Sequence, residues 1–264
     1  MKSNLPEDLP TDIAESLAGA VDRLGPFARS ILWYPTVSST SDVAASLAER
    51  GSPEGCVVAA NAQTAGRGRH GRSWASPAGA GLYLSTVLRP PRDILPALTV
   101  AAGLAVAEGI GAATGFTPTL KWPNDVFADE RKLAGVLAEA ADGIAYVILG
   151  IGINVMPAAY PKDVAALATS LEEELGRPVD RGLLLAECLA ALARRYGDLK
   201  RGGTAAVIDA WRRRAARTLG RRVRWTAGGA TAEGVAEDID ATGALVVRTS
   251  AGTVSITAGE VVWL

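Results

Sequence analysis

The chain has 264 residues, 48% of them hydrophobic, which is enough for one good-sized globular domain and a smaller second one. Its formal net charge of −1 excludes a general attraction to nucleic acid or anionic membranes, so any basic function requires a local cluster of charge. The two cysteines, Cys56 and Cys188, match no paired metal-ligand or redox spacing, which favours a reduced, cytoplasmic compartment without disulfides. Residues 1–30 lack the pattern of a signal peptide.

Composition and periodicity predict three parts. Residues 1–29 form a short helical lead-in with a helix over 11–24, too short for a helix-turn-helix, so we expect no DNA binding. Residues 30–218 form the main domain. Residues 219–264 contain short alternating strands broken by glycine turns, which is typical of a small β-barrel.

In the main domain, several strands follow one another closely, which favours antiparallel pairing and the α+β class. The expected strands cover 31–34, 56–60, 82–88, 120–127, 132–139 and 146–155. The expected helices cover 43–50, 97–113, 183–199 and 205–217. The strands of the last part are expected at 222–225, 232–239, 244–249 and 253–264. The most apolar segment, 95–110, is too short to span a bilayer, so we expect a buried helix and no membrane association.

The loop between the second and third expected strands contains GRGRHGR at residues 66–72. It satisfies the pattern G-x-G-x-x-G, but a dinucleotide-binding turn requires a helix directly afterwards, and here a strand follows. A solvated basic hairpin remains an alternative, as does a single-stranded nucleic-acid groove with Trp74 as its aromatic platform. The spacing of Arg67, Arg69 and Arg72 on a glycine-rich backbone favours binding of a phosphoanhydride.

Three further segments carry candidate residues. Only five residues of the chain are lysines, and two of them, Lys121 and Lys132, begin the segments KWPND and KLAGVL. They are either compact charges at a site or ordinary lysines at strand ends and turns. In GIGIN at residues 150–154, glycines at alternate positions allow either a ligand to lie flat on the strand or close strand packing. His70 is the single histidine, so catalysis by Ser-His, Cys-His or multi-histidine metal sites is not expected.

The order and spacing of four segments resemble the biotin protein ligases. These segments are QTAGRGRHGRSW at 63–74, KWPNDV at 121–126, KLAGVL at 132–137 and GIGINV at 150–155. The resemblance covers roughly 30–218, and the C-terminal barrel also matches. It implies an α+β fold of the class II aminoacyl-tRNA synthetase and biotin ligase type, with a mixed sheet, helices and an SH3-like C-terminal barrel.

The resemblance also implies an activity and its partners. Biotin reacts with ATP to give biotinyl-5′-AMP, and the biotin passes to a lysine of the biotin carboxyl carrier domain of an acetyl- or propionyl-CoA carboxylase. Mg²⁺ is expected, with its ligands unassigned, and the protein is expected to be a cytoplasmic monomer or homodimer without repressor function. A lipoate or octanoyl transferase of the same superfamily is the nearest alternative, although it typically lacks the arginine-glycine loop. A non-catalytic nucleotide or nucleic-acid binding module is an alternative of another class.

Site residues follow from the resemblance by motif position. The expected catalytic residues are Lys132, bridging the biotin carboxylate and the α-phosphate, the loop residues Arg67 and Arg69, and Asp125 as base for the incoming lysine. The expected biotin-binding residues are Ser39, Thr40, Ser41, Gln63, Arg67, Gly68, Arg69 and Lys132. The expected ATP or adenylate contacts are Arg69, Arg72, Trp74, Lys121, Asn124, Gly150, Gly152 and Asn154. Ser41 stands where the family usually has asparagine, so the contact of that amide does not carry over directly.

Overall fold

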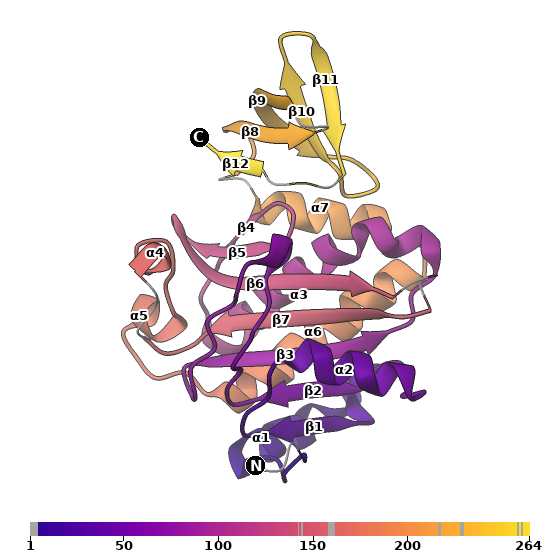
Figure 1. Ribbon diagram of the computed structural model, residues 1–264, viewed down its shortest axis with the longest axis vertical. Helices are drawn as coiled ribbons and strands as arrows, with labels where there is room; N and C mark the ends of the chain where they lie inside the picture. Colours follow the sequence, from indigo (N-terminus) through magenta and orange to yellow (C-terminus); the bar gives the residue numbers. More distant parts are fainter. Residues whose placement is uncertain are drawn as a thin grey trace.

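A seven-stranded mixed sheet forms the centre of the main domain (Figure 1). The computed structural model describes residues 5–141, 143, 145–157, 162–215, 218–227, 230–257, 259 and 261–264. The sheet order is β1 (Ile31–Tyr34), β2 (Val57–Ala60), β3 (Gly81–Leu88), β7 (Val147–Asn154), β6 (Arg131–Ala140), β5 (Asp125–Ala128) and β4 (Thr119–Lys121). The α+β class with a mixed sheet is therefore confirmed.

The strand pairing follows the predicted antiparallel pattern with one exception. β1 and β2 are parallel, because the helix α2 (Thr40–Glu49) lies between them in the chain and returns it to the same end of the sheet. All other ladders of the sheet are antiparallel. The expected single strand over 120–127 is wrong, since Trp122, Pro123 and Asn124 separate β4 from β5. Proline has no backbone N–H to offer a ladder, and the Trp122–Pro123 peptide bond is cis.

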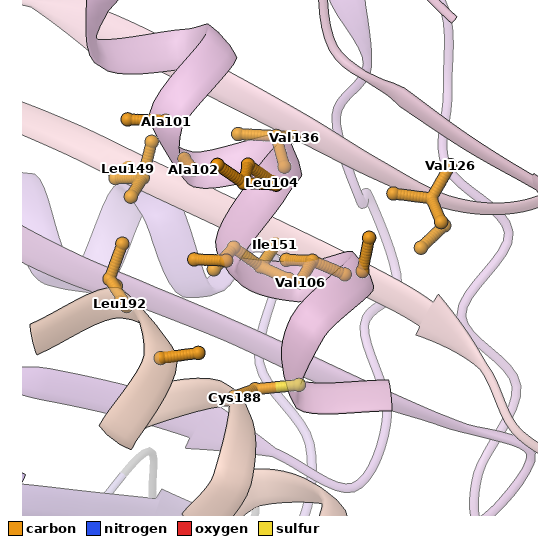
Figure 2. Close-up of a cluster of buried hydrophobic side chains, with 14 of the residues drawn as sticks. Ala101, Ala102, Leu104, Val106, Val126, Val136, Leu149, Ile151, Cys188 and Leu192 are labelled. Carbon is orange, nitrogen blue, oxygen red and sulfur yellow. The ribbon is translucent and has the colours of Figure 1, made fainter. Parts of the chain in front are cut away.

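Helices cover both faces of this sheet (Figure 1). α2 lies on one face and contacts β2, β3 and β7. On the other face, α3 (Leu95–Thr114) packs against β6 and against α6 (Arg181–Lys200). Figure 2 shows this core, where Leu104 and Val106 of α3 lie close to Val136 and Ile151 of the sheet.

Shorter elements complete the main domain. The helix α1 (Thr11–Ala20) packs on α6, and α7 (Thr204–Arg214) packs on α3. The remaining elements are α4 (Lys162–Ala165), α5 (Leu171–Leu175) and the 3₁₀ turns η1 (Val21–Arg23), η2 (Gly25–Ala28), η3 (Arg69–Gly71) and η4 (Arg92–Ile94).

The apolar helix is longer than its sequence suggested. Residues Arg92–Thr114 are long and apolar enough to cross a membrane, and this is the single such helix among the residues described above. Length therefore does not exclude a membrane span, contrary to the sequence argument. Burial decides instead: 72% of the most apolar stretch is covered by the rest of the protein. α3 is therefore a core helix, and its many alanine and glycine residues allow it to pack closely on α6.

The C-terminal part forms a small antiparallel sheet beyond α7 (Figure 1). Its order is β11 (Gly252–Ile256), β10 (Leu245–Thr249), β9 (Ala230–Ile239), β8 (Arg222–Ala227) and β12 (Val261–Trp263). The segment 253–264, expected as one strand, thus contains two strands, β11 and β12, which lie at opposite edges of the sheet. The two parts of the chain are joined by hydrogen bonds, since Trp122 Nε1 donates to the Gly243 carbonyl at 2.8 Å and the Arg221 guanidinium donates to Glu130 Oε1 at 3.2 Å.

Candidate active site

A cluster of buried hydroxyl groups lies at the N-terminus of α2. Ser39 caps the helix, and its side chain accepts from the Ser41 amide. Thr40 donates twice to Gln63 Oε1, from its amide at 2.8 Å and from its hydroxyl at 3.1 Å. Ser39, Thr40 and Ser41 are at most 5% exposed. Four residues predicted to bind biotin, from two distant segments, therefore lie together.

Alternate positions of β7 form a continuous face below this cluster. Gly150, Gly152 and Asn154 point to the side of the sheet that α2 covers, because side chains alternate along a strand. A Cβ atom at position 150 would lie 3.0 Å from the Ser41 hydroxyl oxygen. At position 152 it would lie 2.5 Å from the Trp74 indole nitrogen. A side chain at position 152 would thus collide with the indole, and one at position 150 would crowd the Ser41 hydroxyl.

Trp74 lies over the glycines of two neighbouring strands. Gly135 of β6 pairs with Gly152 of β7, and a Cβ atom on either residue would approach the indole ring to 3.1 Å or less. In this structure the two glycines therefore accommodate a side chain of the arginine loop. The alternating glycines predict either a bound ligand or close strand packing at Gly152, and in this structure an indole from the loop lies there.

Lys132 and Asp125 form an ion pair beside this indole. The Lys132 ammonium is 2.6 Å from Asp125 Oδ1 and 5.3 Å from the centre of the Trp74 ring. The pair comes from adjacent strands, since Asp125 begins β5 and Lys132 lies at the start of β6. Both side chains keep some exposure, 31% for Lys132 and 24% for Asp125, although the paired oxygen Asp125 Oδ1 is itself buried.

The backbone N–H and the backbone carbonyl of Lys132 both form hydrogen bonds with the segment 167–169. Its amide donates to the Leu167 carbonyl at 2.7 Å, and its carbonyl accepts from the Thr169 amide at 3.0 Å. Asn154 Nδ2 donates to the Thr169 carbonyl at 2.9 Å and contacts the Lys132 carbonyl at 3.4 Å. Asn154, predicted to contact the adenylate, is in this structure the residue that ties β7 to the segment around Lys132.

The arginines of the loop occupy different surroundings. Arg67 forms ion pairs with Asp42 of α2 and Glu139 of β6, both at 2.8 Å. Arg69 reaches the Asn124 side-chain oxygen and the Gly259 carbonyl of the C-terminal part, both at 3.4 Å. Arg72 is exposed, and its carbonyl accepts from the Gly68 amide at 2.7 Å, which closes the tip of the loop.

Lys121 lies opposite Asp125 across β4 and β5, and its ammonium lies near aromatic rings from both parts of the chain. Its ammonium lies 5.0 Å from the centre of the Phe127 ring and 5.7 Å from that of the Trp263 ring. Burial lowers the pKa of Lys121 below its ordinary value, against the opposing effect of nearby Asp125. Asn124, three residues later, donates to the Val136 carbonyl at 2.6 Å and is itself buried.

Sequence reasoning missed three residues of the site. Ser85, on β3, is fully buried and contacts the hydroxyls of both Thr40 and Ser41. Asp42 and Glu139 pair with Arg67. A signal for Ser85 existed, because a serine interrupts the apolar run of residues 82–88. The two acids carry no local signal, since their partner lies in another segment.

The matched family models cover both parts of the chain. Residues 33–154 match the biotin/lipoate A/B protein ligase family, and residues 218–263 match the biotin protein ligase C-terminal domain. The fold and the site thus define a protein ligase of the biotin and lipoate type.

Similarity to individual proteins shows which branch of this class the chain belongs to. The chain is 39% identical to the biotin–[acetyl-CoA-carboxylase] ligase of Mycobacterium tuberculosis over 87% of its own length and 86% of the relative's. The biotin protein ligase of Aquifex aeolicus, solved in complex with biotin and ATP, superposes with a TM-score of 0.80 at 30% identity, covering 89% of this chain and 99% of the other. A biotin protein ligase of Leishmania major, in complex with biotinyl-5-AMP, is similar at a TM-score of 0.62 and 26% identity, over 87% and 99%. The chain belongs to the biotin protein ligases.

Proposed function

We propose that this protein forms biotinyl-5′-AMP from biotin and ATP and transfers the biotin to a lysine of a carboxylase carrier domain. One observation carries the proposal: a polar end, a middle where the strand carries no side chain and a cationic end follow one another along a single sheet face. The Trp74 indole lies over this middle in the structure, so the ligand would take its place on Gly152. The buried hydroxyls lie over Gly150, Gly152 lies in the middle, and Lys132 stands beside Asn154. At about 3.4 Å per residue, the four steps from 150 to 154 span about 14 Å. This suits a slender ligand with a polar head and an acid tail.

The hydroxyl cluster is chemically suited to the polar head. A cyclic urea carries one strong acceptor and two N–H donors, and hydroxyl groups can serve as either partner. Ser39, Thr40 and Ser41 are buried, so a hydrogen bond made there is shielded from competing water. We assign the ureido group of biotin to this end, with Gln63 holding Thr40 in place.

Lys132 is suited to the activation step. The biotin carboxylate oxygen attacks the α-phosphorus of ATP, a new P–O bond forms, and the bond to pyrophosphate breaks. Negative charge concentrates where the carboxylate meets the phosphate, and an ammonium held there stabilises the transition state more than the separated reactants. Lys132 remains attached to Asp125 until such an anion competes for it.

Asp125 is suited to the second step. The acceptor amine attacks the acyl carbon of the mixed anhydride, AMP leaves, and the nitrogen must lose a proton. Asp125 is the carboxylate within 2.6 Å of the Lys132 ammonium, so it lies beside the position we assign to the reacting acyl group. When Lys132 turns to the adenylate, this carboxylate becomes available to accept that proton.

The loop supplies phosphate contacts and a cover. Arg67, Arg69 and Arg72 provide guanidinium groups that bind phosphate oxygens in pairs. We propose that Arg67 exchanges its two carboxylate partners for ligand oxygens when the loop closes. Trp74 would then cover the ligand and exclude water from the anhydride, with Gly68 and Gly150 allowing close approach of the backbone. Lys121, Asn124, Gly152 and Asn154 remain proposed adenylate contacts.

Mg²⁺ and the remaining partners are proposals of the same kind. Among the residues that the structure describes, no group of three or more His, Cys, Asp or Glu side chains could hold a metal ion. We propose that Mg²⁺ enters with the ATP phosphates and is held mostly by phosphate and water oxygens. The proposed acceptor is the carrier domain of acetyl- or propionyl-CoA carboxylase, in the cytoplasm, with the ligase as a monomer or homodimer.

A mass measurement tests the proposal. The protein is incubated with ATP, Mg²⁺, biotin and a purified biotin carrier domain, and the acceptor mass is read before and after. We expect one biotin to be added, and nothing when ATP is omitted. Lipoate in place of biotin should give no product. An acceptor that gains lipoate and no biotin would overturn the assignment of the substrate.

A further inference from the structure

Ser85 connects the two hydroxyls at the polar end of the site. Its side-chain oxygen lies 2.8 Å from Thr40 Oγ1 and 3.1 Å from Ser41 Oγ, and the residue has no exposed surface. A buried hydroxyl must direct its single proton to one of its neighbours. The direction of the protons along Ser41, Ser85 and Thr40 therefore decides whether Ser41 meets a ligand as donor or acceptor.

The outer end of this chain fixes the orientation of Gln63. The Trp74 carbonyl can only accept, so Ser76 donates to it at 3.1 Å and must accept from Gln63 Nε2 at 2.8 Å. At the other side of the amide, the Thr40 backbone N–H can only donate, and it meets Gln63 Oε1 at 2.8 Å. Two backbone groups thus place the amide oxygen of Gln63 toward Thr40.

The Gln63 oxygen then draws the proton of Thr40. The Thr40 hydroxyl donates to Gln63 Oε1 at 3.1 Å, so its oxygen must accept from Ser85. With the Ser85 proton used in this way, the Ser85 oxygen accepts from Ser41. The Ser41 proton is consumed inside the cluster, and its oxygen keeps lone pairs for a further partner.

We propose that Ser85 is a positioning residue of the biotin site, which orients the hydroxyl protons so that Ser41 accepts a ring N–H of the ureido group. This inference rests on the proposed function, and it adds the residue that decides which hydroxyl groups of the biotin pocket donate and which accept. Where the family usually has asparagine, Ser41 can then accept a hydrogen bond from the ligand, because it donates its own proton to Ser85 on β3. Gly150 leaves the space for this arrangement, because a Cβ atom there would lie 3.0 Å from Ser41 Oγ and 3.5 Å from Ser85 Oγ.

Thr86 offers a matched control on the same strand. It is as buried as Ser85, but it points to the opposite face and donates to the Cys56 carbonyl at 3.0 Å. That carbonyl also accepts from the Val87 amide at 2.9 Å, so it keeps a partner when the Thr86 hydroxyl is removed. Thr86→Val therefore removes a buried hydroxyl from β3 without changing the chain from Ser41 to Gln63.

Calorimetry with biotin separates the two variants. We expect Ser85→Ala to weaken biotin binding about tenfold, while Thr86→Val stays within about twofold of the wild type. Thermal unfolding of both variants shows that they are folded. If Ser85→Ala does not fold, Ser85→Cys replaces it, and its weaker thiol donor should give a smaller loss in the same direction. Equal losses in the two variants, or wild-type affinity for Ser85→Ala, would overturn the role of Ser85.

Methylated ligands test the direction of the protons. Biotin analogues carrying a methyl group on one or the other ring nitrogen are titrated into the wild type and into Ser85→Ala. We expect one of the two positions to cost more affinity in the wild type than in the variant, because the methyl group removes the N–H that Ser41 accepts. Equal costs in both proteins would overturn the acceptor role of Ser41. A wild type that binds no biotin would instead overturn the proposed function.

Discussion

The Lys132 ammonium lies 2.6 Å from Asp125 Oδ1, and the Trp74 ring stands 5.3 Å away over the same cation. The lysine is thus held by a carboxylate and an aromatic face, and both are partners that an anionic ligand can displace. A cation held in this way has already lost much of its contact with water before a carboxylate or a phosphate arrives.

Removing the ammonium should stop the first reaction. We expect Lys132→Ala to keep its fold but to lose at least about a hundredfold in biotin-dependent pyrophosphate exchange, as the loss of one transition-state charge does elsewhere. Lys132→Arg is the control that keeps the charge with another geometry, and a partial activity is expected. An alanine variant that exchanges pyrophosphate at the wild-type rate would exclude the assigned role of Lys132.

Asp125 should matter more for the second reaction. Asp125→Asn keeps the size of the side chain and removes its basicity, so we expect transfer from preformed biotinyl-5′-AMP to slow by about a hundredfold. Pyrophosphate exchange should fall less. Raising the pH should recover part of the transfer rate, because a larger share of the acceptor amine is then already neutral. If exchange falls as far as transfer, Asp125 acts through Lys132 rather than as a base.

Gly152 should be intolerant of a methyl group. A Cβ atom there would lie 2.5 Å from Trp74 Nε1, so Gly152→Ala must displace the indole. Gly103→Ala on the buried helix α3 is the control, because its new atom would have an ordinary contact of 3.9 Å with Leu120. We expect a changed tryptophan emission spectrum and weak biotin binding only for the Gly152 variant. Unchanged emission would show that the loop does not depend on this glycine.

The ion pairs between α3 and α6 should make stability depend on pH. Burial alone would raise the pKa of Glu108, but the hydrogen bonds from Arg195 and Arg194 together lower it below the ordinary 4.5. Stability from this group is therefore present above about pH 4.5 and is lost as the pH falls through the lower folded value. We expect Glu108→Gln to cost about 2 kcal/mol at neutral pH, measured by urea unfolding, and progressively less in acid.

A matched measurement distinguishes this effect from general surface charge. Glu233 pairs with Arg222 and Arg224 on the exposed side of the C-terminal sheet. Glu233→Gln should change the stability of the protein much less, since exposed pairs are screened by solvent. Equal losses in the two variants would contradict the importance of burial at Glu108.

Local sequence patterns predicted which segments form strands and helices better than they predicted which distant residues contact one another. The strand at 31–34 was predicted with the bounds that β1 has, because its apolar run ends at clear turn residues. The strand at 120–127 was wrong, since alternation of apolar residues does not show a chain reversal at Trp122–Asn124. Ser85 and the two acids that bind Arg67 depend on contacts between residues at least 25 positions apart. Lys121 is an expected adenylate contact by motif position, and its further neighbour Trp263 comes from the end of the chain, which no local pattern indicates.

The hydrogen bonds around Lys132 have a mechanical consequence. Its amide and carbonyl are both bound to the segment 167–169, and Asn154 clamps that segment to β7. The backbone of Lys132 is therefore fixed to the sheet through residues that lie more than thirty positions further along the chain, outside the sequence motif that contains the lysine. A substitution in this distant segment would disturb the position of the ammonium as directly as one in the motif itself.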